Sequence, residues 1–160
     1  MQLEPVEVEL LRSTRRALRH ALETGDPADP ILRRLFSPTV TGDADADAEL
    51  RSMIHDDLLA DRLAGLDALV EVLDRGRTRG GDVLRVDLVD EEPLLVLGVL
   101  NDLRLAIGAR LGIEELERDA EHDDETRYRL AVMDHLAWLQ EQLLAVLDPE
   151  AVRVHEEEDW

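Results

Sequence analysis

The strongest pattern in the chain is the segment from Leu94 to Leu111, which is apolar on nearly every side of a helix. Four polar residues interrupt this segment: Asn101, Asp102, Arg104 and Arg110. A helix that is apolar all round must be buried, and buried charges must be paired. The pattern therefore predicts a central helix, Glu91 to Leu111, that carries a buried polar network.

Amphipathic segments precede this central stretch. The first predicted helix runs from about Pro5 to Gly25. Its apolar stripe consists of Leu11, Leu18, Ala21 and Leu22. A short helix from Ile31 to Phe36 follows Asp29-Pro30, the residue order of an N-cap and a first helical position. A long helical stretch is expected from about Ala48 to Leu73, with Asp56-Asp57 as a kink or as the cap of a second helix.

The segments around the central helix are less regular. Arg75 to Asp82 has the composition of a flexible linker. Val83 to Leu88 has strand character, but a lone short strand has no obvious partner, so we expect at most one marginal strand. Gly112 is placed to end the central helix. A last helix is expected from about Glu125 to Leu147, with Pro149 after it.

Composition favours the same fold class. Leucine dominates the apolar residues, and aromatic residues make up only 2% of the chain. Leucine and alanine favour helices, whereas strands prefer β-branched and aromatic residues. We therefore expect an all-α, single-domain bundle of about five helices around Glu91 to Leu111. The helical domain should cover residues 1–148, and residues 149–160 should form an acidic C-terminal tail.

The polar residues of the central helix need partners on other helices. Asp102 and Arg104 are two positions apart, so their side chains point away from each other and cannot pair directly. The candidate partners on the two neighbouring helices are Asp57, Arg62, Asp134, Gln140 and Glu141. One interpretation is a set of structural ion pairs that fixes the register of the helices. The alternative is a ligand-binding or catalytic role for the same residues.

The net charge of the chain limits the kinds of partner that it can bind. The net charge is −20, which repels nucleic acid and anionic membranes at long range. All 18 basic residues are arginine, a bias typical of a GC-rich bacterial genome. The absence of cysteine excludes disulfides and thiolate metal sites within this chain. With no signal peptide and no apolar run long enough to cross a bilayer, we expect a cytoplasmic protein and no membrane partner.

The most organised surface feature is an arginine stripe on the first helix. The stripe consists of Arg12, Arg15, Arg16 and Arg19. It lies opposite the apolar side and is a candidate surface for phosphates or for an acidic partner. The plainer interpretation is an exposed face whose arginines pair with the carboxylates of the chain itself.

Catalytic and metal motifs are weak. The two His-Asp-Asp triplets at 55–57 and 122–124 invite the hypothesis of a metal-dependent phosphohydrolase. Adjacent helical residues project about 100° apart, however, and carboxylates are abundant in this chain. Phosphate-binding glycine loops, dinucleotide-binding motifs and nucleophile elbows are absent from the sequence. We predict no catalytic, cofactor-binding or metal-ligating residues.

Several segments together resemble a known family. They are LLRSTRRALRHAL, the acidic approach to DDLLADRLAGLDALVEVL, NDLRLAIGARLGI and HLAWLQEQL. They are similar to an actinobacterial domain of unknown function, number two-thousand-and-seventeen. Its members tend to be encoded near a Clp protease adaptor and a sulfur-transfer and cysteine-synthesis set. Some carry a transcription-regulator label tied to oxidative stress. Thiol-based redox sensing, if any member uses it, is impossible in a chain without cysteine.

The resemblance implies no catalytic residues. Position by position, its motif marks Asp57, Arg62, Asn101, Asp102, Arg104, Arg110 and Gln140, all consistent with the predicted buried network. The sequence and the resemblance together predict a non-catalytic cytoplasmic regulatory protein that binds another protein, in transcription or the stress response. The alternatives are a direct nucleic-acid-binding regulator that uses the first-helix arginines, and a metal-dependent hydrolase. A homodimer built on the first and last helices is also expected.

Overall fold

The fold is known from a computed structural model, which describes residues 1–36, 44–78, 80–112 and 121–148. Side chains are described over the same ranges except at 44–47 and 51. The acidic tail expected at 149–160 lies outside these residues, so its structure is not described.

The described residues form five helices, and the all-α class predicted from the sequence is confirmed. The helices are α1 (Pro5–Thr24), α2 (Pro30–Leu35), α3 (Ala44–Arg75), α4 (Glu92–Leu111) and α5 (Asp124–Leu147). The boundaries agree with the predicted ones to within a residue or two, except that α3 begins four residues earlier than expected. The helix α3 also continues through Asp56-Asp57 as one element, so no second helix is capped there.

Short-range chemistry explains where the helices begin and end. Gly25 and Gly112 close α1 and α4 with φ of 68° and 60°, a left-handed conformation that glycine adopts without steric cost. The Asp29 carboxylate accepts a hydrogen bond from the Ile31 amide and caps α2. Asp123 caps α5 in the same way through the amide of Thr126.

The expectation of at most one strand was wrong. Three two-residue strands, β1 (Gln2–Leu3), β2 (Arg77–Thr78) and β3 (Leu84–Arg85), form an antiparallel sheet in the order β1-β3-β2. Main-chain hydrogen bonds of 2.8 and 2.9 Å between Met1 and Val86 extend the pairing of β1 with β3. Strands this short carry no alternating pattern, and β1, one of the two partners of β3, lies some eighty residues away in the sequence.

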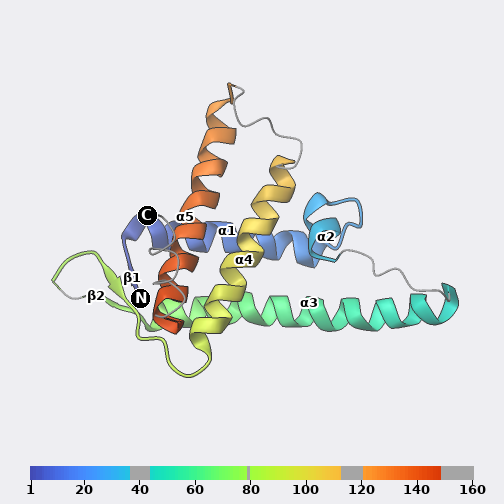
Figure 1. The fold of residues 1–160 in the computed structure, drawn as a ribbon, viewed down its shortest axis with the longest axis horizontal. Helices are drawn as coiled ribbons and strands as arrows, with labels where there is room; N and C mark the ends of the chain where they lie inside the picture. Colours follow the sequence, from blue (N-terminus) through green and yellow to red (C-terminus); the bar gives the residue numbers. More distant parts are fainter. Residues whose placement is uncertain (37–43, 79, 113–120, 149–160) are drawn as a thin grey trace, which may run out of the picture.

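A leucine-rich core joins all five helices, and α4 contacts each of the other four. Figure 1 shows α4 and α5 side by side, crossing α1 and α3. Leu103 of α4, Leu136 of α5 and Leu69 of α3 are fully buried in this core. The position of α4 at the centre of the bundle therefore matches the prediction.

The central helix is nevertheless not enclosed on every side. Leu94 is 60% exposed, and Gly98 and Asn101 are exposed as well. These three positions are one helical turn apart and mark a strip of α4 that its neighbours leave uncovered. An apolar pattern all round the helix indicated burial, but it did not show that one strip remains open.

Candidate functional site

The polar residues of α4 form separate links instead of one network. The first joins Asp102 to Arg62 of α3 by an ion pair between side chains that are 16% and 22% exposed. Arg62 also donates a hydrogen bond to the main-chain oxygen of Leu35, at the end of α2, at 3.3 Å. Its guanidinium lies 5.6 Å from the centre of the Phe36 ring, within the range of a cation–π contact. One arginine of α3 thus holds α2 and α4 together.

A second link joins α4 to α5. Arg104 Nη1 donates to Gln140 Oε1 at 2.6 Å, and Gln140 Nε2 donates to the main-chain oxygen of Leu97 at 3.4 Å. Gln140 is the one polar side chain that is buried among the described residues. A buried amide needs such partners, because an unsatisfied polar group costs about 1–3 kcal/mol. The link therefore fixes how α5 lies against α4.

Three of the predicted network residues are exposed. Asn101 lies on the uncovered strip of α4, and Asp57 lies on an exposed part of α3. Arg110 is half-exposed and pairs with Asp29, the cap of α2, at 3.0 Å. The burial predicted for these three residues is wrong, because α4 is open along one side and α3 extends beyond the bundle. The residues that the structure brings together are Arg62 with Asp102 and Arg104 with Gln140.

The arginine stripe of α1 lies largely against α3. Arg12 pairs with Asp74 at 2.6 Å, and Arg15 pairs with Asp67 at 3.0 Å. Arg19 forms an ion pair with Asp67 too. The stripe therefore contributes to the contact between α1 and α3, and these three arginines of the candidate partner surface are paired within the chain. The plainer interpretation, pairing with the chain's own carboxylates, describes them.

The rest of the stripe pairs within α1. Arg16 is well exposed, and its guanidinium lies 3.1 Å from Glu9. Arg19 also donates to Glu23 at 2.7 Å. The hydrogen bond from Arg19 to Glu23, together with the charge of Asp67, raises the pKa of the Arg19 guanidinium. Arg16 is therefore the arginine of the stripe that is most accessible to an external partner.

An ion pair that the sequence did not reveal joins the end of α3 to the start of α4. Arg75 meets Glu92 with two hydrogen bonds of 2.8 and 2.5 Å and donates to the main-chain oxygen of Asp87. Glu92 also accepts from the amide of Val89 at 2.9 Å. The hydrogen bond from Arg75, followed by that from Val89, lowers the pKa of Glu92. These bonds fix the loop before α4.

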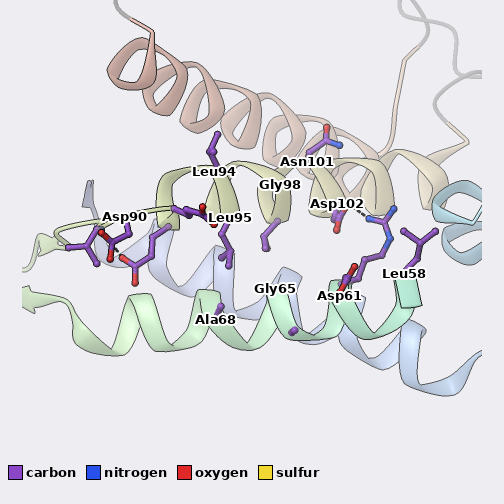
Figure 2. A pocket seen from close by; sticks show the side chains of 16 residues that line it. Leu58, Asp61, Gly65, Ala68, Asp90, Leu94, Leu95, Gly98, Asn101 and Asp102 are labelled. Carbon is purple, nitrogen blue, oxygen red and sulfur yellow. Dashed lines mark hydrogen bonds and ion pairs between the residues drawn. The ribbon is translucent and has the colours of Figure 1, made fainter. Parts of the chain in front are cut away.

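Next to that loop, α3 and α4 border an open groove of about 930 Å³. Figure 2 shows the lining side chains, with Asp90 at one end and Asp61 near the other. The walls are small or apolar residues of both helices. They include Ala64, Gly65, Ala68, Leu94, Leu95 and Gly98. We call this feature the α3–α4 groove.

The α3–α4 groove continues into an exposed part of α3. Every described side chain from 48 to 58 is exposed, and Figure 1 shows this end of α3 running past the bundle. We call residues 48–58 the α3 arm. Its large apolar side chains are 39–61% exposed and recur at the spacing of one helix face. They are Leu50, Met53, Ile54 and Leu58. Leu58 also lines the groove, so the two surfaces are continuous.

Sequence reasoning missed the α3–α4 groove and the α3 arm because it predicted that α4 is enclosed on all sides and identified no exposed apolar face on α3. One signal was available. Glycine inside a helix costs about 1 kcal/mol relative to alanine. Gly98 in the sequence therefore indicates that another part of the protein, or a partner, approaches α4 closely at this position. A Cβ added at Gly98 would meet nothing within 4 Å. The fold of the described chain therefore does not itself require glycine at this position.

The two histidine triplets are part of the local structure. The ring of His55 packs on Phe36 at 4.4 Å between centroids. In the second triplet, Asp123 caps α5, and the hydrogen bonds that it accepts from Thr126 lower its pKa. Within the described ranges, no group of three or more histidine and carboxylate side chains is placed to hold a metal ion.

The fold is that of a mainly helical, all-α protein with an open groove between α3 and α4. The family model Domain of unknown function (DUF2017) matches residues 1–147, and the chain belongs to this family. Neither the search of curated proteins nor that of solved structures finds a match. None of the described helices combines the length and the hydropathy that a membrane crossing needs.

Proposed function

We propose that this chain is a non-catalytic, cytoplasmic regulatory protein that works by binding another protein. The observation that carries the proposal is the α3 arm, where Leu50, Met53 and Ile54 are exposed together on one helix. Single exposed apolar residues are ordinary, but a contiguous apolar patch marks an interaction surface. A role in transcription or the stress response rests on the family resemblance and is part of the same proposal.

The two alternatives draw less support. Nucleic-acid binding through α1 would need arginines that are free to meet phosphates, and Arg12, Arg15 and Arg19 are paired with carboxylates of α3. The net charge of −20 acts against it as well. Among the described residues, no arrangement of side chains supports a metal-dependent hydrolase. A homodimer remains a proposal. Its interface would include the exposed side chains of Trp138 and Val146 on α5.

The test is affinity purification from a lysate of the source cells, with quantitative mass spectrometry of the bound proteins. Three baits are compared: the wild type, the double variant Met53→Ser with Ile54→Ser, and the control Val6→Ser. Val6 is 74% exposed in the first turn of α1, and Figure 1 shows that this end of α1 lies far from the α3 arm. Circular dichroism confirms that all three baits are folded.

We expect one or a few proteins to be retained by the wild type and the control but lost with the arm variant. Purified recombinant forms of those proteins should then bind the wild type directly. Recovery of the same proteins by all three baits would contradict the proposal, and so would the absence of any protein enriched over an empty matrix.

A further inference from the structure

The α3–α4 groove has the shape to receive a helix. Its α3 side presents Ala64 and Ala68, and Gly98 lines its α4 side, on the same exposed strip as Leu94. Small side chains let a third helix approach closely, and the open space at Gly98 leaves room for its side chains. Exposed Leu94, at the edge of the groove, supplies apolar surface that such a helix would cover.

The length of the groove fits about three helical turns. Its lining on α3 runs from Leu58 to Ala68, a distance of about 15 Å at the rise of an α-helix. A helix of this length presents anchors at positions i, i+3 or i+4, and i+7, the spacing by which amphipathic helices bind grooves. The contact is therefore large enough for a short amphipathic helix.

The edge of the groove is negatively charged. Asp61, Asp90 and Glu91 are exposed, and within the described part of the chain none of them forms a hydrogen bond or ion pair through its side chain. The one basic residue in the lining, Arg62, is already paired with Asp102. These three carboxylates are thus uncompensated, and they would meet basic residues of a partner favourably.

The backbone at one of these carboxylates is also unusual. Asp90 has φ of 52°, and it is the only residue other than glycine with a positive φ among those described. A left-handed conformation is strained at such a residue and is often kept at functional sites. It places a carboxylate directly at the mouth of the groove, where glycine would be less strained.

We propose that the α3–α4 groove binds a basic amphipathic helix of a partner protein. Leucine-like anchors of that helix would lie against the groove walls, and flanking lysines or arginines would meet Asp61, Asp90 and Glu91. This proposal rests on the proposed function and identifies the chemistry of the partner. A second copy of the chain fits less well, because its own α3 arm carries Glu49, Asp56 and Asp57 and would bring like charges together.

Synthetic peptides test the proposal with the intact protein. The probe is a fluorescent peptide of about 14 residues, enough for three turns and its ends, with leucines at i, i+3, i+4 and i+7 and lysines on the flanks. A scrambled peptide has the same composition but no amphipathic face. It measures the general electrostatic attraction to a protein with a net charge of −20. A third peptide has glutamate in place of lysine. Fluorescence anisotropy gives each affinity at low and at high salt.

We expect the basic amphipathic peptide to bind the wild type about tenfold or more tightly than either control peptide. Its affinity should fall as salt rises, since exposed charges are screened. Equal binding of the scrambled peptide would overturn the proposal, because general charge attraction would then account for the affinity. Tighter binding of the glutamate peptide would overturn it as well.

Variants locate the peptide in the groove. Gly98→Leu fills the open space and should weaken binding about tenfold or more. The fold should survive, because a Cβ at Gly98 meets nothing within 4 Å and leucine favours helix more than glycine does. Neutralising Asp61 and Glu91 to amides should weaken binding about threefold and reduce its salt dependence. Unchanged peptide affinity in Gly98→Leu, with its melting temperature retained, would overturn the assignment.

The matched control is Glu71→Gln, which removes one exposed carboxylate of α3 outside the groove and should change affinity by less than about twofold. Light scattering with the wild type and Gly98→Leu tests the second-copy alternative. A dimer that Gly98→Leu dissociates would overturn the proposal in favour of self-association. If the peptides fail but the lysate experiment identifies an arm-dependent protein, the helix proposal is wrong and the proposed function stands.

Discussion

The ion pair between Arg62 and Asp102 should contribute measurably to the free energy of unfolding. Replacing Arg62 should cost more stability than replacing Asp102. Arg62→Ala leaves the Asp102 carboxylate, which is only 16% exposed, without its cation. Breaking a buried pair from one side costs about 3–5 kcal/mol, and the partial exposure of both side chains reduces this to about 2–3 kcal/mol. The same change removes the contacts of Arg62 with Leu35 and Phe36.

Asp102→Ala should cost less. The guanidinium that remains keeps its hydrogen bond to Leu35 and its position over Phe36, so we expect a loss of about 1–2 kcal/mol. The double variant should be about as stable as Arg62→Ala alone, with a coupling free energy of about 1–2 kcal/mol.

Urea denaturation followed by circular dichroism at the helix band gives the free energy of unfolding for all four proteins. Additive effects, within about 0.5 kcal/mol, would mean that the two side chains do not interact in solution. A larger loss of stability for Asp102→Ala than for Arg62→Ala would refute this reasoning, which assumes that Arg62 keeps its contacts with Leu35 and Phe36 when Asp102 is replaced.

Three further predictions concern other residues and the nucleic-acid alternative. Arg104→Ala should lower the melting temperature by several degrees more than Arg12→Ala, because it leaves buried Gln140 short of a partner at about 1–3 kcal/mol, against under about 1 kcal/mol for an exposed pair. Equal melting temperatures would contradict this. The pKa of Glu92 is lowered in the folded state, so its ion pair with Arg75 stabilises the protein above the ordinary glutamate pKa and is lost as pH falls through the lowered value. Glu92→Gln should therefore be less stable than the wild type at neutral pH, with the difference shrinking in melting curves below about pH 4.5; a constant difference would refute the link. Specific binding to duplex DNA at physiological salt should be no tighter than about micromolar by anisotropy, and a nanomolar, salt-sensitive complex would revive the nucleic-acid alternative.

Features that depend on neighbouring residues were predictable from the sequence. Gly25, Asp29 and Gly112 end or begin helices because of their own conformational and hydrogen-bonding preferences, and the chain places these caps where the pattern indicated. The central position of α4 was also predictable, since its apolar residues point in every direction.

Features that depend on distant residues were not. Periodicity shows which side of α1 carries arginines, but it does not show that Asp67 and Asp74 of α3 lie within their reach. It likewise gave no reason to pair β3 with residues at the start of the chain. The opening of α4 at Asn101 depends on how four neighbouring helices share its surface, which no local pattern encodes.

The unequal support along α3 has a consequence for its hydrogen exchange. At 32 residues α3 is about 48 Å long, and the buried side chains among those described in it, such as Leu66, Leu69 and Leu73, all lie in its second half. Helices without tertiary packing are marginal at lengths below about 12–15 residues. We expect amides in the first half of α3 to exchange through local opening, and those near Leu69 only when the whole domain unfolds. A single continuous helix would then contain two cooperative units, and a partner that binds the first would be detected as slower exchange there.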